Sequence, residues 1–317
     1  MSTYKEIKGQ LIRQVSSDPS NPLEGQIWYN TSTGFLKVYK NVGGVWSSGG
    51  SLNTANTYAG AGTQTAAVGF VGSNTEEYDG SSWTATNPMN TARQAATAQN
   101  ATQTAALAAG GAVGPSIQSV VEEYNGSTWS EEADLSTARR QLAGFGTQTA
   151  GAVSGGETPS RTTATEEYNG SSWTGGGAMN TARNAFSATG IQTAGLAVSG
   201  QFPGSPNITN AVEEYNGTSW TTVNSINTKR QYSASVGIQT AALTFGGYNG
   251  TALSAKTEEY DGTSWTESSD LSTARQLHGG AGTQSAGLAF GGQTPPNTTA
   301  TEEYVDPSFA TQTLTTS

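Results

Sequence analysis

The phrase Glu-Glu-Tyr recurs six times along the 317-residue chain, and this repeat constrains the fold more than any other feature. The interval between copies is about 45 residues, a period typical of architectures in which each copy forms one supersecondary unit. The six copies end at Tyr78, Tyr124, Tyr168, Tyr215, Tyr260 and Tyr304. The fold can therefore be predicted for one unit and repeated.

Other residues, which we call landmarks, recur at fixed distances from these tyrosines. A Trp follows each of the first five tyrosines by five residues, and an Arg follows each Trp by ten, closing the phrase NTAR, STAR or NTKR. A Gln in a Gly/Thr-rich turn and a short apolar run complete the unit. These landmarks are Trp83, Trp129, Trp173, Trp220, Trp265, Arg93, Arg139, Arg183, Arg230 and Arg275.

Each unit predicts four short strands separated by turns. Asp-Gly or Asn-Gly lies between Glu-Glu-Tyr and Trp in five copies, beginning with Asp79-Gly80, and these dipeptides favour tight hairpins. Four antiparallel strands repeated at this period are typical of a β-propeller. We predict an all-β fold with a six-bladed propeller of four-stranded blades over residues 46–317.

The repeat resembles the kelch family. The matching residues are a Gly pair such as Gly246-Gly247 that ends the second strand, the Tyr of the third strand and the Trp of the fourth. Two units depart from the pattern, with Val71-Gly72 and Ser199-Gly200 in place of the pair. The resemblance implies the propeller architecture but no particular activity, because propellers host unrelated functions.

The last unit predicts how the ring closes. It reads EEYVDPSF, which lacks the Asn-Gly turn and has Phe309 in place of Trp, and Pro307 cannot donate a ladder hydrogen bond. Trp46 precedes Asn56 by the same ten residues that separate every other Trp from its Arg. We expect the strand around Trp46 to complete the blade formed by residues 275–304. A five-bladed ring and an open solenoid remain alternatives.

Paired glutamates could indicate glycoside hydrolysis, in which two carboxylates flank one bond. Here the pair is repeated in every unit, and adjacent strand residues such as Glu166 and Glu167 point to opposite faces. We therefore expect a structural role, in which one Glu meets a repeat Arg of its own or a neighbouring blade. Asn56 replaces that Arg in the first unit and should leave one pair unmade.

Composition excludes several classes of function. The chain has no Cys and one histidine, His278, which leaves no basis for disulfides, thiol catalysis or a histidine-rich metal site, so we expect no metal and no cofactor. A net charge of −10 disfavours nucleic-acid binding. The sequence has no apolar run long enough to predict membrane insertion, and its first residues do not resemble a signal peptide. His278 is expected to be an ordinary strand or channel residue.

Variation within the repeat predicts a recognition surface. The segment between the second and third strands is short in the first unit and longer in the other five. These loops should emerge on the same face as the connections between blades, and loops on a rigid scaffold often carry binding residues. The candidate ligand-binding residues are Arg161, Phe202, Asn207, Tyr248, Asn249 and Lys256.

Residues 1–45 lie outside the repeat and predict an arm followed by a β-hairpin. The phrase DPSNPLEGQIWYNTSTGFLKVYKN, residues 18–41, resembles a short module near the start of many tail and virion proteins of bacteriophages, notably marine ones. This resemblance implies a virion protein assembled in the host cytoplasm, in which residues 1–45 bind other virion proteins. Multiple copies or a homo-oligomer are expected on the particle.

Together these features predict a non-enzymatic tail appendage or fibre component whose propeller recognises host-surface glycan. Weak sites on many tethered copies would give strong attachment through avidity. One alternative is a protein that decorates the capsid. A second is a carbohydrate-active propeller enzyme, which would need unique acids clustered at one loop face, and a third is a bacterial interaction propeller without a phage role.

Overall fold

The structure is a computed structural model that describes residues 12–19, 26–40, 44–94, 97–98, 102–204, 207–306 and 310–313. The chain forms two compact units. One unit is Val45–Val305, and the other combines Met1–Gly44 with Asp306–Ser317. The described residues form strands, turns and loops, and none of them forms a helix long and apolar enough to cross a membrane.

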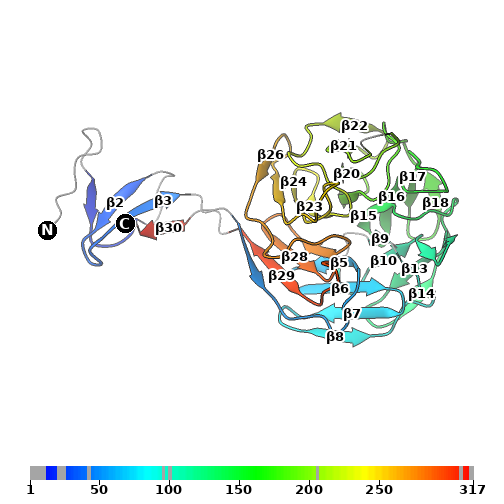
Figure 1. Cartoon of the computed structure of the whole chain (residues 1–317), viewed down its shortest axis with the longest axis horizontal. Coiled ribbons are helices and arrows are strands. Elements are labelled where there is room, and N and C mark those ends of the chain that lie inside the picture. The colour runs from blue at the N-terminus through cyan, green and yellow to red at the C-terminus, as the bar shows by residue number, and fades with distance from the viewer. Residues whose placement is uncertain are drawn as a thin grey trace. The chain divides into compact units, whose positions relative to one another are not determined.

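Unit Val45–Val305 consists of six four-stranded antiparallel sheets, which are the blades of a β-propeller (Figure 1). The first three blades are β5 (Ala59–Thr63), β6 (Ala66–Val71), β7 (Asn74–Tyr78) and β8 (Trp83–Thr86); β9 (Thr97–Ala98), β10 (Leu107–Ala109), β13 (Val121–Tyr124) and β14 (Trp129–Glu131); and β15 (Ala143–Thr147), β16 (Ala150–Ser154), β17 (Thr165–Tyr168) and β18 (Trp173–Gly175). A small hairpin, β11 (Ala112–Val113) and β12 (Ser116–Ile117), lies in the loop of the second blade.

The next three blades repeat this order of strands. They are β19 (Ser187–Ile191), β20 (Ala194–Val198), β21 (Val212–Tyr215) and β22 (Trp220–Val223); β23 (Ala234–Ile238), β24 (Ala241–Phe245), β25 (Thr257–Tyr260) and β26 (Trp265–Glu267); and β27 (Gly279–Gly282), β28 (Ala286–Phe290), β29 (Thr301–Val305) and β4 (Val45–Ser48). We number the blades 1 to 6 in this order, starting with β5–β8.

The predicted closing strand is present. Strand β4 pairs antiparallel with β29, and Trp46 lies opposite Tyr304 in the register that Trp and Tyr share in the other blades. The Trp46 indole donates a 3.0 Å hydrogen bond to Oγ1 of Thr257 in blade 5. Blade 6 is thus completed by a strand from the other end of the chain, which ties the first and last repeats together.

The ring is closed by packing at every blade junction. Each innermost strand contacts the innermost strands of both neighbouring blades, including β27 with β5. The buried hydrophobic residues form six clusters, and each cluster combines side chains from two adjacent blades. The junction of blades 6 and 1 holds Phe290 against Trp83, with ring centroids 4.6 Å apart. The alternatives of five blades or an open solenoid are therefore wrong.

Turn chemistry places the strands as the sequence predicts. Asp79 and the equivalent Asn or Asp residues accept backbone hydrogen bonds two and three residues later, and the following glycine has a positive φ, 91° at Gly80. The Gly pair also has positive φ values, 66° at Gly246 and 103° at Gly247. Glycine adopts these angles without strain, whereas Ser199 takes the first of the two positions in blade 4 with a φ of 66°.

The second unit is a four-stranded sheet with the order β1, β2, β3, β30. Its strands are β1 (Arg13–Val15), β2 (Ile27–Asn30), β3 (Phe35–Lys40) and β30 (Ala310–Thr313). The predicted hairpin corresponds to β2 and β3, whereas β30 pairs with β3. The prediction assigned residues 46–317 to the propeller, but Asp306–Ser317 belong to the smaller unit, in which Ala310–Thr313 form β30. The predicted docking residues Met1–Leu11 lie outside the described residues.

Candidate functional site

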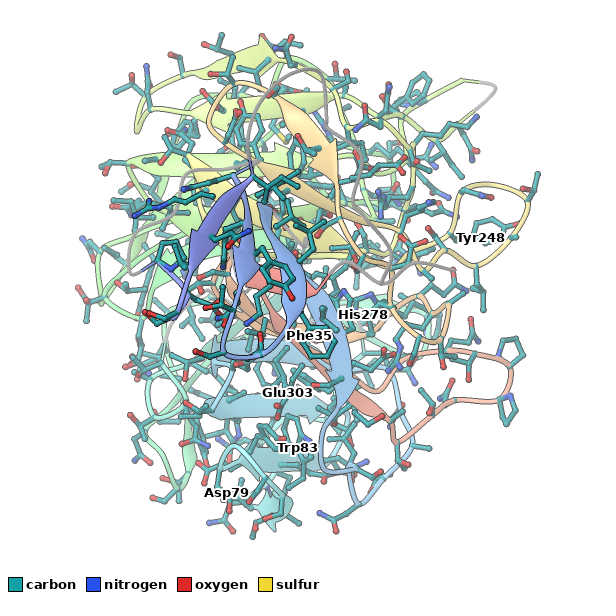
Figure 2. All side chains as sticks on the ribbon, turned by 90° about the vertical axis from the view of Figure 1, so that its left-hand side faces the viewer. Phe35, Asp79, Trp83, Tyr248, His278 and Glu303 are labelled. Carbon is teal, nitrogen blue, oxygen red and sulfur yellow. The ribbon has the colours of Figure 1, made fainter. Side chains whose placement is uncertain are left out.

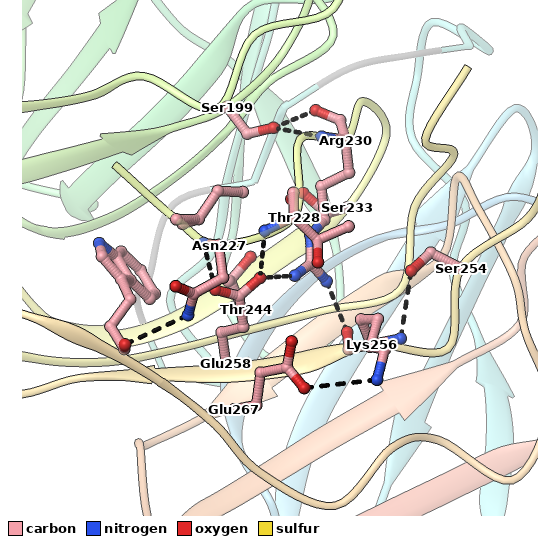
Figure 3. Close-up of polar contacts among 12 residues, drawn as sticks. Ser199, Asn227, Thr228, Arg230, Ser233, Thr244, Ser254, Lys256, Glu258 and Glu267 are labelled. Atoms are coloured by element: carbon pink, nitrogen blue, oxygen red, sulfur yellow. Dashed lines mark hydrogen bonds and ion pairs between the residues drawn. The ribbon is translucent and has the colours of Figure 1, made fainter. Parts of the chain in front are cut away.

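The landmark arginines form buried ion pairs inside the blades. Arg230 shows the arrangement: its guanidinium contacts Glu258, the first Glu of its blade, and donates to the backbone oxygen of Lys256 (Figure 3). All five landmark arginines are at most 1% exposed. The pairs are Arg93–Glu122, Arg139–Glu166, Arg183–Glu213, Arg230–Glu258 and Arg275–Glu302. In these five blades the first glutamate of Glu-Glu-Tyr therefore has a structural partner in its own blade.

Blade 1 lacks the arginine but not the contact. The hydroxyl of Tyr58 donates a 2.8 Å hydrogen bond to Glu76, the first Glu of that blade. Backbone amides of Asn53 and Thr54 complete the coordination of this carboxylate. The expectation that Asn56 leaves a pair unmade holds for the ion pair, but Tyr58 supplies the missing donor.

The second glutamate of the repeat acts across blade junctions. Tyr78 of blade 1 donates a 2.5 Å hydrogen bond to Glu303 of blade 6. Burial, with a smaller contribution from Glu303, raises the pKa of Tyr78 to about 12. The same contact joins Tyr124 to Glu77, Tyr215 to Glu167, Tyr260 to Glu214 and Tyr304 to Glu259. The sequence did not predict this role of tyrosine.

The repeated Gln and Trp side chains also link neighbouring blades. Gln192 of blade 4 donates through Nε2 to the backbone oxygens of Gly151 and Tyr168 in blade 3, each at 2.9 Å. The indole of Trp220 donates to Oγ1 of Thr165 across the same junction. The repeated polar residues thus hold the scaffold together, so a binding site must be sought among residues that are not repeated.

A cavity of about 400 Å³ lies where the innermost strands of the six blades begin. Residues just before these strands form bridges with the long loops, such as Arg140 with Glu157 and Gln231 with Tyr248. The cavity therefore opens on the face that carries the long loops, which we call the loop face. In Figure 2, Tyr248 lies in a projecting loop on this face, whereas Asp79 marks a hairpin turn toward the other face.

Four residues at the cavity have left-handed backbone conformations that are unusual for non-glycine residues. They are Gln141, Ala185, Tyr232 and Leu277, with φ between 53° and 56°. Each of the last three donates its amide hydrogen to the carbonyl of the preceding one, at 2.9, 2.8 and 3.0 Å. We call this run of hydrogen bonds the collar. Strained backbone is common at functional sites, so the collar is a candidate part of such a site.

A network of side chains extends from the collar into the loops. Nε2 of Gln141 donates to the hydroxyl of Tyr232 at 2.9 Å, and Nδ2 of Asn184 donates to Oε1 of Gln141 at 2.7 Å. Arg161 donates through Nε to Oδ1 of Asn184 and through Nη2 to Oε1 of Gln201, at 2.7 and 2.9 Å. Gln141, Asn184 and Arg161 each occur once at their positions in the repeat, and among the described residues this network joins blades 3, 4 and 5.

Of the six predicted binding residues, Arg161 is the one that this network includes. Asn207 and Asn249 line a separate groove between the loops of blades 4 and 5. Oδ1 of Asn249 accepts hydrogen bonds from the amides of Thr251 and Ala252, so this side chain stabilises its own turn.

The other three predicted residues do not converge on one point. Phe202 is half-buried and pairs through its backbone with Asn207. Tyr248 is bridged to Gln231 on one side of its loop. Lys256 forms ion pairs at 3.5 Å with Glu267 (Figure 3) and at 3.3 Å with Asp270, and so neutralises acids of its own blade.

Sequence analysis missed the cavity residues of the collar and of the innermost strands. A signal was present, because the position two residues after the landmark Arg reads Gln141, Ala185, Tyr232 and Leu277 in successive blades, whereas the Arg itself is constant. Glu157, a unique acid on this face, is paired at 3.3 Å with Arg140.

His278 also lines the cavity, in agreement with its expected place in a strand or channel. It is 6% exposed, and its ring stacks on Phe245 with centroids 5.4 Å apart. Burial, together with the charge of Arg275, lowers its pKa to about 4. The imidazole is therefore neutral at ordinary pH. The described residues contain no group of three or more side chains that could hold a metal ion.

Comparison with known proteins gives the fold. No protein-family model matches the sequence, and no curated protein matches it. Among solved structures, the chain is similar to one titled "Structure of YjhT", with a TM-score of 0.68 and 14% identity. The match covers 83% of this chain and 99% of that chain. At this identity the likeness shows the β-propeller architecture and carries no activity across.

Proposed function

We propose that this chain is a non-enzymatic bacteriophage virion protein, a tail appendage or fibre component that presents a kelch-type propeller for recognition of host-surface glycan. Residues 1–45 provide the attachment to other virion proteins. The phage assignment rests on the phrase DPSNPLEGQIWYNTSTGFLKVYKN, part of which forms the β2–β3 hairpin of a unit distinct from the propeller.

One observation carries the recognition role: the repeated polar residues serve the scaffold, while the unrepeated ones gather on the loop face. Five arginines, the paired glutamates and the tyrosines bind one another within or between blades. Gln141, Asn184 and Arg161 instead form a network at the mouth of a cavity. A face that varies on a constant scaffold is the arrangement expected of a binding surface.

The non-enzymatic assignment is supported by the positions of the carboxylates. Glycoside hydrolysis needs two carboxyl groups about 5–9.5 Å apart on either side of one bond. Glu166 and four of its counterparts are bound to buried arginines, and Glu76 is bound to Tyr58. Glu167 and four of its counterparts accept hydrogen bonds from tyrosines of the next blade. These acids stabilise blades and junctions rather than face a common substrate.

Two measurements test the proposal. Quantitative mass spectrometry of purified particles should find the chain at a low, tail-like ratio to the major capsid protein. Purified protein should also bind host cells, and periodate oxidation of the cell-surface glycan should abolish this binding. A capsid-like ratio would favour a decoration protein, and absence from the particle would overturn the virion assignment.

A further inference from the structure

The axial cavity has two different walls. Blades 4 and 5 contribute the hydroxyl groups of Ser187, Ser233 and Ser235, whereas blades 1, 3 and 6 contribute Ala and Gly at the start of their innermost strands. Those small residues are Ala59, Gly60, Ala143, Gly144, Gly279 and Gly280. The cavity lining therefore combines a group of hydroxyls from blades 4 and 5 with small apolar residues from blades 1, 3 and 6, where Thr57, Gln141 and His278 also line it.

The hydroxyl groups form a chain whose direction can be deduced. Oγ1 of Thr244 donates to the carbonyl of Ala234 at 3.1 Å, and Oγ of Ser235 donates to Thr244 at 3.1 Å. Because the Ser235 proton is used, Ser187 must donate to Ser235, 2.7 Å away. Ser233, 3.3 Å from Ser187, can then donate to Ser187. Each hydroxyl has a single proton, so in this arrangement Ser233 offers a ligand its lone pairs.

Tyr232 provides the complementary group. Its hydroxyl accepts a hydrogen bond from Gln141, and burial raises its pKa, so the phenol keeps its proton. Among the described residues no acceptor for this proton is recorded, which leaves it for a ligand. The cavity lining thus includes a donor at Tyr232 and an acceptor at Ser233.

Charge at the cavity disfavours ions. The guanidinium of Arg93 is already bound to Glu122 and to the backbone oxygens of Gly110 and Ala108. A carboxylate or phosphate can only accept hydrogen bonds and would face the lone pairs of Ser233. An ammonium group would lose its hydration without gaining a carboxylate partner, which is costly in a buried site.

We propose that the axial cavity binds an uncharged saccharide, with ring hydroxyls on Tyr232 and Ser233 and the C–H face of the ring on the Ala/Gly wall. A sugar hydroxyl both donates and accepts, which matches this pair, and a cavity of about 400 Å³ is within the usual range for small ligands. This inference rests on the proposed glycan recognition and specifies its ligand chemistry. The collar holds Tyr232 in place because its backbone is bonded to Ala185 and Leu277.

The test is titration of the full chain with methyl glycosides of neutral hexoses and with the corresponding hexuronates, followed by ligand-observed NMR. Neutral glycosides should bind the wild type, and hexuronates should bind more weakly. Ser233→Ala and Tyr232→Phe should each weaken binding about fivefold, the effect expected for one hydrogen bond. Ser171→Ala, in an exposed hairpin turn on the other face, is the control and should bind like the wild type.

Melting temperatures of all variants verify that the fold is retained. Equal binding of neutral glycosides by wild type, Ser233→Ala and Tyr232→Phe would overturn the cavity inference while leaving glycan recognition in place. Tighter binding of hexuronates would overturn it as well. If the wild type binds neither the glycosides nor host cells, the proposed function itself fails.

Discussion

The hydroxyl of Tyr58 donates to Glu76 across 2.8 Å and so takes the place that a buried arginine occupies in the other five blades. The replacement exchanges an ion pair for a neutral donor while the carboxylate keeps its backbone partners Asn53 and Thr54. Blade 1 therefore closes with one buried charge fewer than its neighbours.

Tyr58→Phe should destabilise the protein by about 1–2 kcal/mol, because a buried carboxylate oxygen loses one of its two donors and keeps the Thr54 amide. Urea denaturation measures this change in the free energy of unfolding. Tyr248→Phe, in a projecting loop, is the matched control and should change the stability little. Equal effects of the two substitutions would show that the contact with Glu76 has no special importance.

Arg183→Met should cost about 3–5 kcal/mol, because it leaves Glu213 buried without its cation. Adding Glu213→Gln should recover part of this loss, since the remaining partner is then uncharged. Thermal unfolding of the two single variants and the double variant gives the coupling energy. Strictly additive losses would contradict a direct interaction between the two side chains.

Trp46→Ala should lower stability by about 3–5 kcal/mol, the usual cost of truncating a buried tryptophan. Trp46 is 9% exposed, packs 5.1 Å from the ring of Tyr304 and closes the ring. Trp173→Ala is the matched comparison, because Trp173 is only half-buried and lies within a continuous blade. The Trp46 variant should also be cut faster by protease; equal cleavage of the two variants would contradict the closing role of β4.

Asp18 should make the smaller unit sensitive to acid. Hydrogen bonds from Lys37, Asn30 and Trp28 lower its pKa from 3.8 to about 2. A lowered pKa in the folded state gives stabilisation that is complete above the unfolded value of 3.8 and is lost as the pH falls toward 2.

The indole N–H resonance of Trp28, which donates to Asp18 at 3.0 Å, reports this change. It should shift as the pH falls toward 2, with a midpoint near the pKa of Asp18 in the folded state, about 2. In Asp18→Asn the shift should vanish. A shift that persists in the variant would assign the titration to another group.

Most of the propeller could be predicted from the sequence because its contacts are repeated. Six copies of one phrase specify six blades, and the spacing from Trp46 to Asn56 identifies the closing strand. The recurrence of Glu and Arg predicted that one Glu of each unit pairs with an Arg of its own or a neighbouring blade, and the structure shows that it is the first Glu and the Arg of the same blade. The pairing of Tyr with the second Glu joins different repeats, so no spacing within one unit could show it.

The site was harder to predict because it depends on residues that occur once. Variation in loop length predicted the loop face and Arg161. It did not indicate Tyr232 and Ser233, because these residues follow a landmark Arg closely and lie outside the long loops. The strand β30 was also missed, because residues 310–313 form no part of the repeat and pair with the distant β3.

The measurement that tests the account most directly is inhibition of phage adsorption by the purified chain. Soluble protein should compete with particles for host cells, Ser171→Ala should compete equally well, and Tyr232→Phe should compete several-fold less. Competition that is unaffected by Tyr232→Phe would place recognition outside the axial cavity. Failure of the wild-type chain to compete at any concentration would contradict the central claim that this propeller recognises the host surface.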